Sequence, residues 1–331
     1  MSNPAQLKTL YPFTFVPIFK DRVWGGRKLE TLYQKALPAD QPIGESWEIS
    51  DRPGDASVIA NGPLAGKDLR WLMEHHEREL LGKGNALNGR FPLLVKILDA
   101  QQDLSLQVHP PAQKAAELGG EPKTEMWYFT DCTPEAVIFA GLKNGVTRAE
   151  FEQKTRQGGV AECFHRLPVK AGDSMFLPSG RVHALGAGSV MFEIQQNSDT
   201  TYRVYDWDRV GLDGKPRDLH IEQSLASIDF TDFEPPLVKS EFSRNATFKL
   251  RYLVDDPLFY VNACRVKKRE RFYLNMQSAL ILGIVQGQLK ISFQGQDLLL
   301  KAGQFCLVPA VCEKVAVQTE TQVEFLQAEP G

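Results

Sequence analysis

One short pattern occurs twice in this chain, and it constrains the fold more than any other feature. The sequence KAGDSMFLPSGRVHAL and the later sequence KAGQFCLVPAVCEKVAV both begin with Lys-Ala-Gly. Five residues and a proline follow in each, so Gly172 precedes Pro178 just as Gly303 precedes Pro309. A glycine turn, a strand and a proline turn that recur in this way predict two copies of one β unit.

Strand-like runs predominate between these turns. They are four to nine residues long, rich in β-branched and aromatic residues, and bounded by Gly, Pro, Asn or Asp. The runs are PLLVKILDA, DLSLQVHP, EMWYF, AVIFAG, DSMFLP, SVMFEIQQ and TTYRVYDW. Regular alternation of strand and helix is missing from the sequence pattern, which predicts a mainly antiparallel β protein with inserted helices.

Four helices are predicted, all within the first 235 residues. KDLRWLMEHHERELLG has leucines at helical spacing and ends at Gly82, and PAQKAAELGG ends at Gly119. Thr147 and Glu150 form a capping box that begins a third helix, and LHIEQSLASI is the fourth. The first half of the chain is therefore expected to carry the helical insertions.

The length of 331 residues suits two domains of ordinary size. The segment DFEPPLVKSE contains the adjacent prolines Pro235 and Pro236, and strand-like runs resume after it. We therefore expect a first domain over residues 1–235 and a second, mostly β domain over residues 236–331.

Composition and charge exclude several classes of partner. The formal charge of −3 offers no basic surface for nucleic acid or an anionic membrane, whereas a small anionic ligand needs only a few cations. No apolar run of about 18 residues predicts a membrane span, and the N-terminal sequence MSNPAQLKTLYPFTF lacks the pattern of a secretory signal. The cysteines contain no CxxC pair and are odd in number, which indicates free thiols and a cytoplasmic location. They are Cys132, Cys163, Cys264, Cys306 and Cys312.

The run LSLQVHPP places two polar side chains on a predicted interior face. Apolar and polar residues alternate in it as in a half-buried strand, yet Gln107 and His109 occupy the inward parity. Burial of two polar groups without partners would cost a few kcal/mol, so another group must satisfy them. A metal ion is one such partner.

The first copy of the repeated pattern extends to Gly172-x5-Pro178-x-Gly180-x2-His183. This resembles the second sequence motif of the cupin superfamily, whose members are small β-barrels of two sheets that hold a metal between them. Ala187 stands where that motif usually has asparagine. In the second copy of the pattern, Lys314 takes the place of the histidine.

The first cupin motif is matched less closely. Gln107-Val108-His109 stands for its His-x-His, and Glu125 follows after an insertion. Glu125, at the head of EMWYF, and His183 can come from neighbouring strands. Gln, His, Glu and His offer two nitrogens and two oxygens, a set suited to Zn²⁺ or another divalent first-row ion. Such a set without thiolates is typical of a catalytic site with an open position.

A closer resemblance covers LSLQVHPP, KTEMWYF, PSGRVHALGAG and FEIQQNSDTTYRVYDWDR. Together these segments resemble the type I mannose-6-phosphate isomerases in their shorter bacterial form. The resemblance extends from about Val23 to Arg209 and continues more weakly through the second copy of the pattern. It implies two cupin-type jelly-roll β-barrels, a mannose-metabolising isomerase, and one Zn²⁺ per chain. The ligands that it implies are Gln107, His109, Glu125 and His183.

The resemblance also implies a reaction. Mannose 6-phosphate and fructose 6-phosphate interconvert when a proton moves between carbons 1 and 2 of the open-chain sugar, through a cis-enediol. Glu193, Lys123 or a metal-bound water could carry the proton. Arg203 could bind the phosphate or the enediolate, and we favour the reacting end. The implied catalytic residues are Arg203, Glu193 and Lys123, and the implied substrate-binding residues are Lys96, Ser105 and Trp24.

Three alternatives remain open at the level of sequence. Two histidines and a carboxylate also suit non-haem iron, so a cupin oxygenase is a second hypothesis, and a non-catalytic sugar-phosphate-binding protein is a third. Glu193 could point outward from an edge strand. His75-His76-Glu77 looks like a metal motif, but adjacent residues of a helix do not share a face, so we expect solvated surface. We expect a monomer or a weak homo-oligomer.

Overall fold

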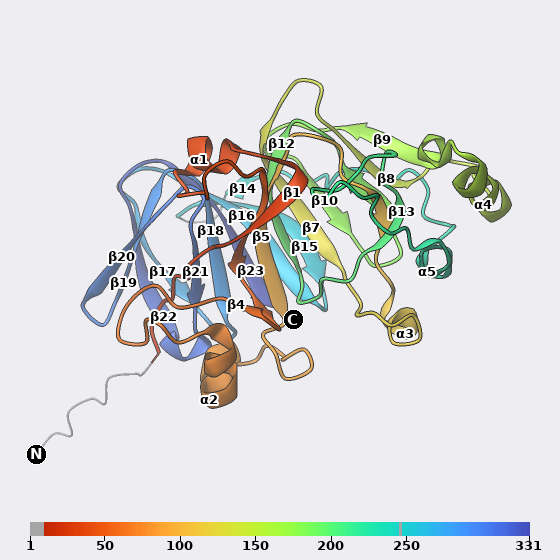
Figure 1. Ribbon diagram of the computed structural model, residues 1–331. Helices are drawn as coiled ribbons and strands as arrows, with labels where there is room; N and C mark the ends of the chain where they lie inside the picture. Colours follow the sequence, from red (N-terminus) through yellow and green to blue (C-terminus); the bar gives the residue numbers. More distant parts are fainter. Residues whose placement is uncertain (1–9, 245–246) are drawn as a thin grey trace, which may run out of the picture. The chain divides into compact units, whose positions relative to one another are not determined.

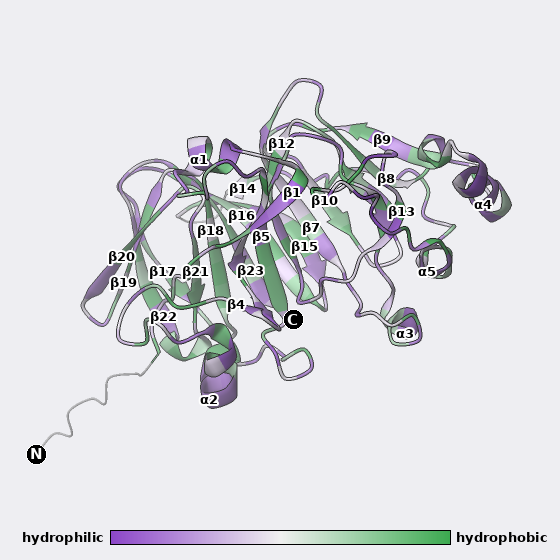
Figure 2. Cartoon of the chain, in the orientation of Figure 1, coloured by the Kyte–Doolittle hydropathy of each residue, from purple (hydrophilic) through white to green (hydrophobic). Residues whose placement is uncertain are grey.

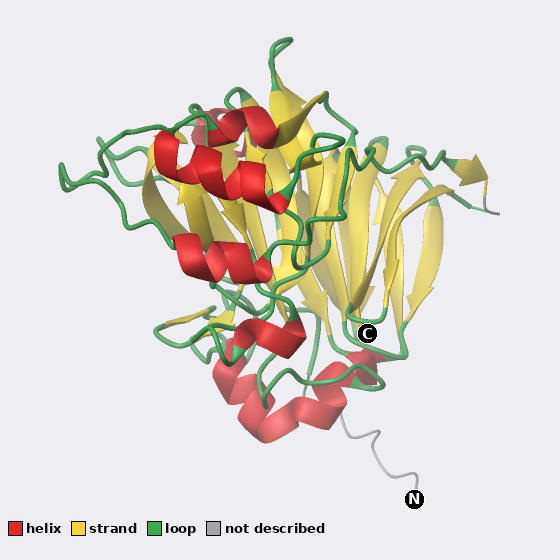
Figure 3. Cartoon of the chain, turned by 90° about the vertical axis from the view of Figure 1, so that its right-hand side faces the viewer, coloured by secondary structure: helices red, strands yellow, loops and turns green. Residues whose placement is uncertain are grey.

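The computed structural model describes residues 10–244 and 247–331, which form two compact units. Unit 1 contains the residues up to Ile18, Glu48–Leu94 and Ser240–Gly331. Unit 2 contains Phe19–Trp47 and Val95–Lys239. Strands make up most of the regular structure, as Figure 3 shows, so the prediction of a mainly β protein is confirmed. The predicted division at residue 235 stays a prediction, and unit 1 additionally includes residues 48–94.

Two sheets form unit 2 (Figure 1). The larger has the order β1-β2-β5-β12-β7-β10 and the smaller the order β13-β6-β11-β8-β9. The strands of the larger sheet are β1 (Ile18–Gly26), β2 (Ile43–Ile49), β5 (Leu93–Ala100), β12 (Ser189–Gln196), β7 (Glu125–Cys132) and β10 (Ser174–Leu177). Those of the smaller are β13 (Tyr202–Tyr205), β6 (Leu106–Val108), β11 (His183–Leu185), β8 (Val137–Leu142) and β9 (Phe164–Pro168).

The smaller sheet buries both of its faces. Its inner face joins the larger sheet in one apolar core, in which Ile138 and Leu185 meet Leu98 and Met191. Its outer face packs against the helices that follow, through side chains such as Leu106 of β6. The alternation in LQVH follows from this arrangement, because Leu106 and Val108 face the helices whereas Gln107 and His109 face the other sheet.

The helices of unit 2 are α1 (Lys28–Tyr33), α3 (Ala112–Ala115), α4 (Arg148–Gln157) and α5 (Ile221–Ser227), with the 3₁₀ turn η1 (Val160–Cys163). The capping box is confirmed on its first half, since the backbone N–H of Glu150 donates to the Thr147 hydroxyl over 3.2 Å. Helix α4 is mostly hydrophilic (Figure 2) and buries only Phe151.

Unit 1 contains two sheets, helix α2 (Leu69–Leu81), the 3₁₀ turn η2 (Ala310–Cys312) and the short pair β3 (Asp51–Arg52) and β4 (Asp55–Ala56). The larger sheet has the order β14 (Ser243–Arg244), β15 (Lys249–Asp256), β16 (Phe259–Val266), β23 (Val323–Pro330), β18 (Leu280–Gln286) and β21 (Phe305–Val308). The smaller has the order β17 (Arg271–Asn275), β22 (Lys314–Thr319), β19 (Gln288–Phe293) and β20 (Gln296–Lys301). As predicted, Gly82 ends α2.

The repeated sequence pattern has the same backbone structure in both units. Gly172 and Gly303 adopt positive φ angles of 89° and 77°, which favour glycine. The Gly172 N–H donates to Phe129 of β7, and the Gly303 N–H donates to Ile284 of β18. In each unit the residue after the glycine then accepts a bond from that same partner. The prediction of two copies of one β turn and strand is therefore confirmed.

All five cysteines are free, as expected. Among the described residues, no helix is both long and apolar enough to span a bilayer. The first nine residues, on which the absence of a secretory signal was partly judged, lie outside the described ranges.

Candidate metal and substrate site

Two histidines and a glutamate meet between the two sheets of unit 2. His109 Nε2 lies 3.3 Å from Glu125 Oε2, and His183 Nε2 lies 3.2 Å from Glu125 Oε1. One ligand atom from each residue lies within 4.8 Å of the others, and all three residues are buried. The sequence predicted this convergence from three separate segments.

Strand register brings these side chains together. His183 at the start of β11 lies directly opposite Gln107 of β6, and Gln107 lies opposite Arg203 of β13 on its other side. Directly opposed residues project from the same face of a sheet, so these three point towards the larger sheet. Glu125, the first residue of β7, comes from that larger sheet.

Four buried atoms of the cluster form no hydrogen bond among the described residues, although Glu125 Oε2 lies within ion-pair distance of Lys123. They are both ring nitrogens of His109 and both carboxylate oxygens of Glu125. Burial is the largest cause that lowers the pKa of His109, to about 3, and Lys123 lowers it further, so the imidazole is neutral near pH 7. Burial alone would raise the pKa of Glu125, but Lys123 and His109 lower it well below its ordinary value. A neutral imidazole and an ionised carboxylate are the forms that bind a metal ion.

Neighbouring groups orient the cluster. His183 Nδ1 lies 2.9 Å from the Arg181 carbonyl oxygen, which leaves Nε2 on the side of Glu125. Gln107 Nε2 lies 3.2 Å from His183 Nε2. The Lys123 Nζ lies 2.9 Å from Glu125 Oε2 and is itself buried. Metal-binding histidines are usually held in this way through their second nitrogen.

A row of polar side chains crosses the inner face of the larger sheet. In sheet order from β1 to β7 it consists of Arg22, Glu45, Lys96, Glu193 and Trp127. Arg22 Nε lies 2.9 Å from Glu45 Oε1, and Lys96 Nζ lies 3.8 Å from Glu45 Oε2 and 3.2 Å from Glu193 Oε2. The Trp127 indole N–H donates to Glu193 Oε1 over 2.9 Å. We call these five residues the polar row.

The polar row reaches the cluster through its last member. The Trp127 ring meets the His183 ring edge to face, with ring centroids 5.5 Å apart. The strand that carries Glu193, β12, lies between β5 and β7, and the residue is only 4% exposed. The alternative in which Glu193 points outward from an edge strand is therefore wrong.

Ion pairing along the row outweighs the cost of burial. Burial alone would raise the pKa of Glu45, but Lys96 and Arg22 lower it to about 2. For Lys96, burial alone would lower the pKa, and Glu193 and Glu45 raise it above its ordinary value. Lys96 is thus a permanent cation that already serves two carboxylates.

The depressed pKa of Glu45 predicts an acid-dependent loss of stability. A carboxyl whose pKa falls from 4.5 to about 2 on folding stabilises the folded state above pH 4.5. This contribution is lost as the pH falls from 4.5 towards 2, and it amounts to roughly 3 kcal/mol. We expect the free energy of urea unfolding of Glu45→Gln to lie below that of the parent protein at neutral pH. The difference should shrink over this interval, and a constant difference from pH 6 to pH 2 would contradict the prediction.

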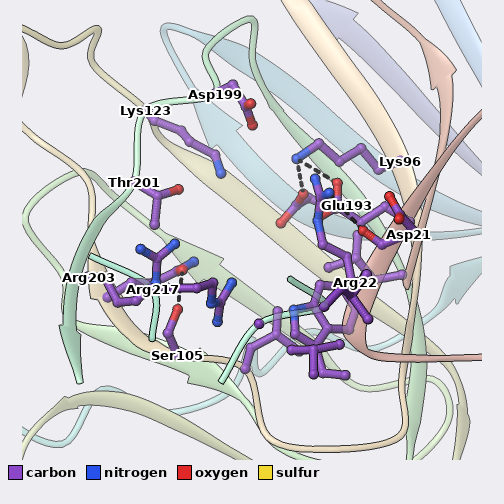
Figure 4. A pocket seen from close by; sticks show the side chains of 18 of the residues that line it. Asp21, Arg22, Lys96, Ser105, Lys123, Glu193, Asp199, Thr201, Arg203 and Arg217 are labelled. Carbon is purple, nitrogen blue, oxygen red and sulfur yellow. Dashed lines mark hydrogen bonds and ion pairs between the residues drawn. The ribbon is translucent and has the colours of Figure 1, made fainter. Parts of the chain in front are cut away.

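A cavity of about 580 Å³ opens beside the cluster and the polar row. It brings together most of the residues predicted to act on the substrate, and Figure 4 shows many of them. The predicted residues that line it are Trp24, Lys96, Ser105, Gln107, Lys123, Glu193 and Arg203. Residues that sequence reasoning missed are Asp21, Arg22, Glu45, Asp199, Thr201 and Arg217. The segment GESWEIS was noted for its resemblance, but nothing in it marked Glu45 as a partner of a lysine far along the chain.

Charge is distributed unevenly in this cavity. Figure 4 shows Lys96 and Glu193 on one side and Arg203, Arg217 and Ser105 on the other. A small polar molecule with one anionic end fits such a division.

His75 lies elsewhere, on α2, where its Nδ1 lies 2.9 Å from the Trp71 carbonyl oxygen and its ring stacks on Trp71. As expected, it takes no part in the cluster.

Comparisons with known proteins point to one family. The family model described as phosphomannose isomerase type I, catalytic domain, matches residues 13–150. Mannose-6-phosphate isomerase ManA of Bacillus subtilis is 45% identical over 224 residues, which cover 67% of this chain and 69% of that protein.

Solved structures agree with these matches. The crystal structure of the mannose 6-phosphate isomerase from Bacillus subtilis is 31% identical, has a TM-score of 0.88, and is matched over 97% of this chain and 100% of its own. A mannose 6-phosphate isomerase crystallised with bound zinc is 18% identical, with a TM-score of 0.77 over 97% of this chain and 100% of that one. The comparison with the zinc-bound isomerase, at 18% identity, shows a similarity of fold alone.

Proposed function

The chain belongs to the type I mannose-6-phosphate isomerase family, and from this premise we propose that it interconverts mannose 6-phosphate and fructose 6-phosphate. Its substrate is then a phosphorylated hexose, and the reaction moves a proton between carbons 1 and 2 of the open-chain sugar through a cis-enediol. The observation that carries the proposal is the buried cluster of His109, Glu125 and His183, in which four buried atoms form no hydrogen bond among the described residues, beside a charged cavity.

We propose that Gln107, His109, Glu125 and His183 hold one Zn²⁺ per chain. The residues fit such an ion, because the His109 imidazole and the Glu125 carboxylate, whose buried atoms form no hydrogen bond, meet a second imidazole, that of His183, beside the Gln107 amide. When bound, the ion supplies a Lewis acid that lowers the energy of negative charge on the sugar oxygens. The structure of a zinc-bound isomerase with the same fold supports the choice of metal.

Three side chains of the cavity are our candidates for catalysis: Glu193 and Lys123 for the proton transfer, and Arg203 for stabilisation of the enediolate. Glu193 accepts hydrogen bonds or ion pairs on both oxygens, from Trp127 and Lys96, so its carboxylate is held in one orientation at the cavity wall. Lys123 places an ammonium group beside Glu125 and lines the same cavity. Arg203 contributes a guanidinium, which can stabilise an enediolate. The Glu193 carboxylate can accept the proton from one carbon and return it to the other, whereas Lys123 can do so only as the neutral amine.

The proposed substrate-binding residues lie on different walls. Ser105 is buried and donates from its hydroxyl to Gln107 Oε1 over 3.4 Å, and Trp24 belongs to the apolar core. Lys96 was predicted to bind the substrate, but it is enclosed by Glu193 and Glu45. We therefore propose that Lys96 shapes the cavity wall and orients Glu193.

We also propose that each unit is a cupin-type β domain. The larger sheets share one order, with β14, β15, β16, β23, β18 and β21 in the places of β1, β2, β5, β12, β7 and β10. In the smaller sheets β17, β22, β19 and β20 take the places of β6, β11, β8 and β9. The shared glycine turn supports the same correspondence.

Unit 1 lacks the metal ligands under this correspondence. Register relates the positions, because Lys314 lies opposite Asn275 of β17 as His183 lies opposite Gln107 of β6. Pairing of β21 with β18 gives the position of the glutamate in the same way. The positions that correspond to Gln107, Glu125 and His183 are occupied by Asn275, Leu280 and Lys314. The proposed catalytic residues therefore all fall within residues 1–235, the predicted first domain.

The two alternative functions have weaker support. The relatives reported above are named as isomerases, which favours neither an oxygenase nor a non-catalytic binding protein. Turnover of mannose 6-phosphate under strict anaerobiosis separates the isomerase from the oxygenase. Binding of the sugar phosphate without conversion by metal-loaded protein would support the third hypothesis. A cytoplasmic location and a monomeric or weakly associated state are kept as proposals, the first because all five cysteines are free.

The experiment that tests the function is a coupled assay of mannose 6-phosphate conversion before and after chelation. We expect activity to fall with the chelator and to return when Zn²⁺ is added, because the cluster then regains its cation. Buffer exchange without chelator serves as the control. Full turnover by protein that elemental analysis finds free of metal would contradict the proposed metal dependence.

A further inference from the structure

One end of the cavity is rich in arginine. Arg203 of β13 and Arg217 of the segment that follows this strand both line it, together with Ser105 and Thr201 (Figure 4). The two guanidinium groups are close enough that Arg217 lowers the pKa of Arg203, after burial, which is the larger cause. Sequence reasoning assigned Arg203 to the site but gave no role to Arg217.

A single buried carboxylate fixes Arg217 in place. Arg217 donates from Nε to Asp206 Oδ2 over 2.7 Å and from Nη2 to Asp206 Oδ1. Arg209 donates to the same Oδ1 from Nε and Nη2, over 3.1 and 2.8 Å. Asp206 is 5% exposed and, although burial alone would raise its pKa, the hydrogen bonds from Arg217 and Arg209 lower it. One negative charge therefore serves two guanidinium groups, and Arg203 adds a third positive charge.

Donors of this cluster are left without acceptors. Nε and Nη2 of Arg217 are occupied by Asp206, and Nη1 has no hydrogen-bond partner within the described ranges. Arg203 donates from Nη1 to the Asp218 carbonyl over 2.7 Å, whereas its buried Nε has no partner there. Two further acids of this end, Asp213 and Asp218, are both exposed, and Asp213 accepts from the backbone N–H of Lys215. Fixed N–H donors with excess positive charge suit an oxyanion such as phosphate.

The opposite end of the cavity suits an anion poorly. There the charge of Lys96 is shared by Glu193 and Glu45, and the charge of Arg22 is taken by Glu45. A phosphate dianion placed at that end would face two buried carboxylates. The phosphate group is therefore expected to bind at the arginine-rich end of the cavity.

We propose that Arg217, oriented by Asp206, binds the phosphate group of the substrate, with Ser105 beside it and with Arg203 acting at this end of the cavity and not at the reacting end considered above. This inference rests on the proposed isomerase function and names the residue that recognises the phosphate. Strand order makes the geometry reasonable, because β6 separates Arg203 on β13 from His183 on β11. Two strand spacings are about 10 Å, a separation that an open-chain hexose phosphate can span towards the His109, Glu125 and His183 cluster.

The test uses Arg217→Ala in the metal-loaded full chain, with mannose 6-phosphate as substrate and inorganic phosphate as competitive inhibitor. We expect the KM and the inhibition constant of phosphate to rise together by about 10- to 100-fold, since a charge-assisted bond is lost. The kcat should change much less, because Arg217 does not touch the reacting carbons. Calorimetric titration with inorganic phosphate gives a second readout that requires no turnover. Arg217→Lys, which keeps the charge without the paired geometry, should recover part of the affinity.

Arg209→Ala is the matched control. It removes the same charge from the same carboxylate, but Arg209 does not line the cavity, so the KM should rise less than about threefold. An equal effect of the two variants, or unchanged KM and phosphate affinity in Arg217→Ala, would overturn the inference. Failure of the parent protein to convert mannose 6-phosphate would instead count against the isomerase. Phosphate binding that is lost in Arg217→Ala would support the inference even then.

Discussion

Replacement of His183 by alanine is expected to remove both the bound metal and the turnover of mannose 6-phosphate. His183 is buried, its Nδ1 is held by the Arg181 carbonyl, and its Nε2 faces Glu125 at 3.2 Å. No other histidine of the described chain joins the cluster besides His109, so no substitute ligand is available. We expect kcat/KM to fall by roughly 10³-fold or more, which corresponds to about 4 kcal/mol of transition-state stabilisation. Elemental analysis and the coupled assay measure the two effects on the same sample.

His75→Ala is the matched control for this experiment. His75 is exposed and stacks on Trp71, outside the cluster, so metal content and kcat/KM should stay close to those of the parent protein. Retention of the full metal content by His183→Ala would refute the ligand assignment. Loss of metal with preserved turnover would instead show that the bound ion is not required for turnover.

Replacement of Lys96 by methionine is expected to destabilise the protein strongly. Lys96 is the only cation of the polar row that reaches both Glu45 and Glu193, and all three side chains are buried. Methionine keeps much of the volume but leaves two carboxylates without their shared partner. Removal of one member of a buried ion pair typically costs about 3–5 kcal/mol, so we expect a loss of this size in the free energy of urea unfolding at pH 7.

Lys28→Met provides the comparison for Lys96→Met. Lys28 pairs with Asp131 at 2.7 Å, but both side chains are partly exposed, at 29% and 38%. Such a pair contributes at most about 1 kcal/mol. Similar losses of unfolding free energy in the two variants would show that burial does not increase the contribution of the Lys96 ion pairs to stability. A drop in kcat of Lys96→Met under conditions where it remains folded would additionally support the orienting role of Lys96 towards Glu193.

Much of the fold could be read from local pattern. The predicted strands are present, and the glycine turn that recurs in the sequence recurs in the backbone, because Gly172 and Gly303 both require positive φ angles. Element lengths were less accurate. Strand β6 covers only Leu106–Val108, and the second proposed ligand of its run, His109, lies just beyond the last strand residue. A short strand is sufficient here because the neighbours β11 and β13 fix its register.

Sequence analysis predicted only those site residues that belong to recognisable motifs. Gln107, His109, Glu125 and His183 stand in recognisable segments, and the structure brings the last three within reach of one ion. Glu45 and Arg217 belong to no recognisable motif. The role of a single glutamate or arginine can be predicted only when the residue that it contacts is known. Those partners are set by strand order and by a turn of the chain, which local sequence does not encode.

The way the chain passes between the units has a consequence for its synthesis. Unit 2 possesses all of its residues once Lys239 has left the ribosome, and the proposed ligands are then all present. Unit 1 is different, because Phe13 pairs with Leu307 and Gly82 pairs with Ser278, so its early segments wait for partners translated last. Unit 2, which contains the proposed ligands, can thus fold while the early segments of unit 1 are still unpaired. Those segments are protected from aggregation only when synthesis of the chain is complete.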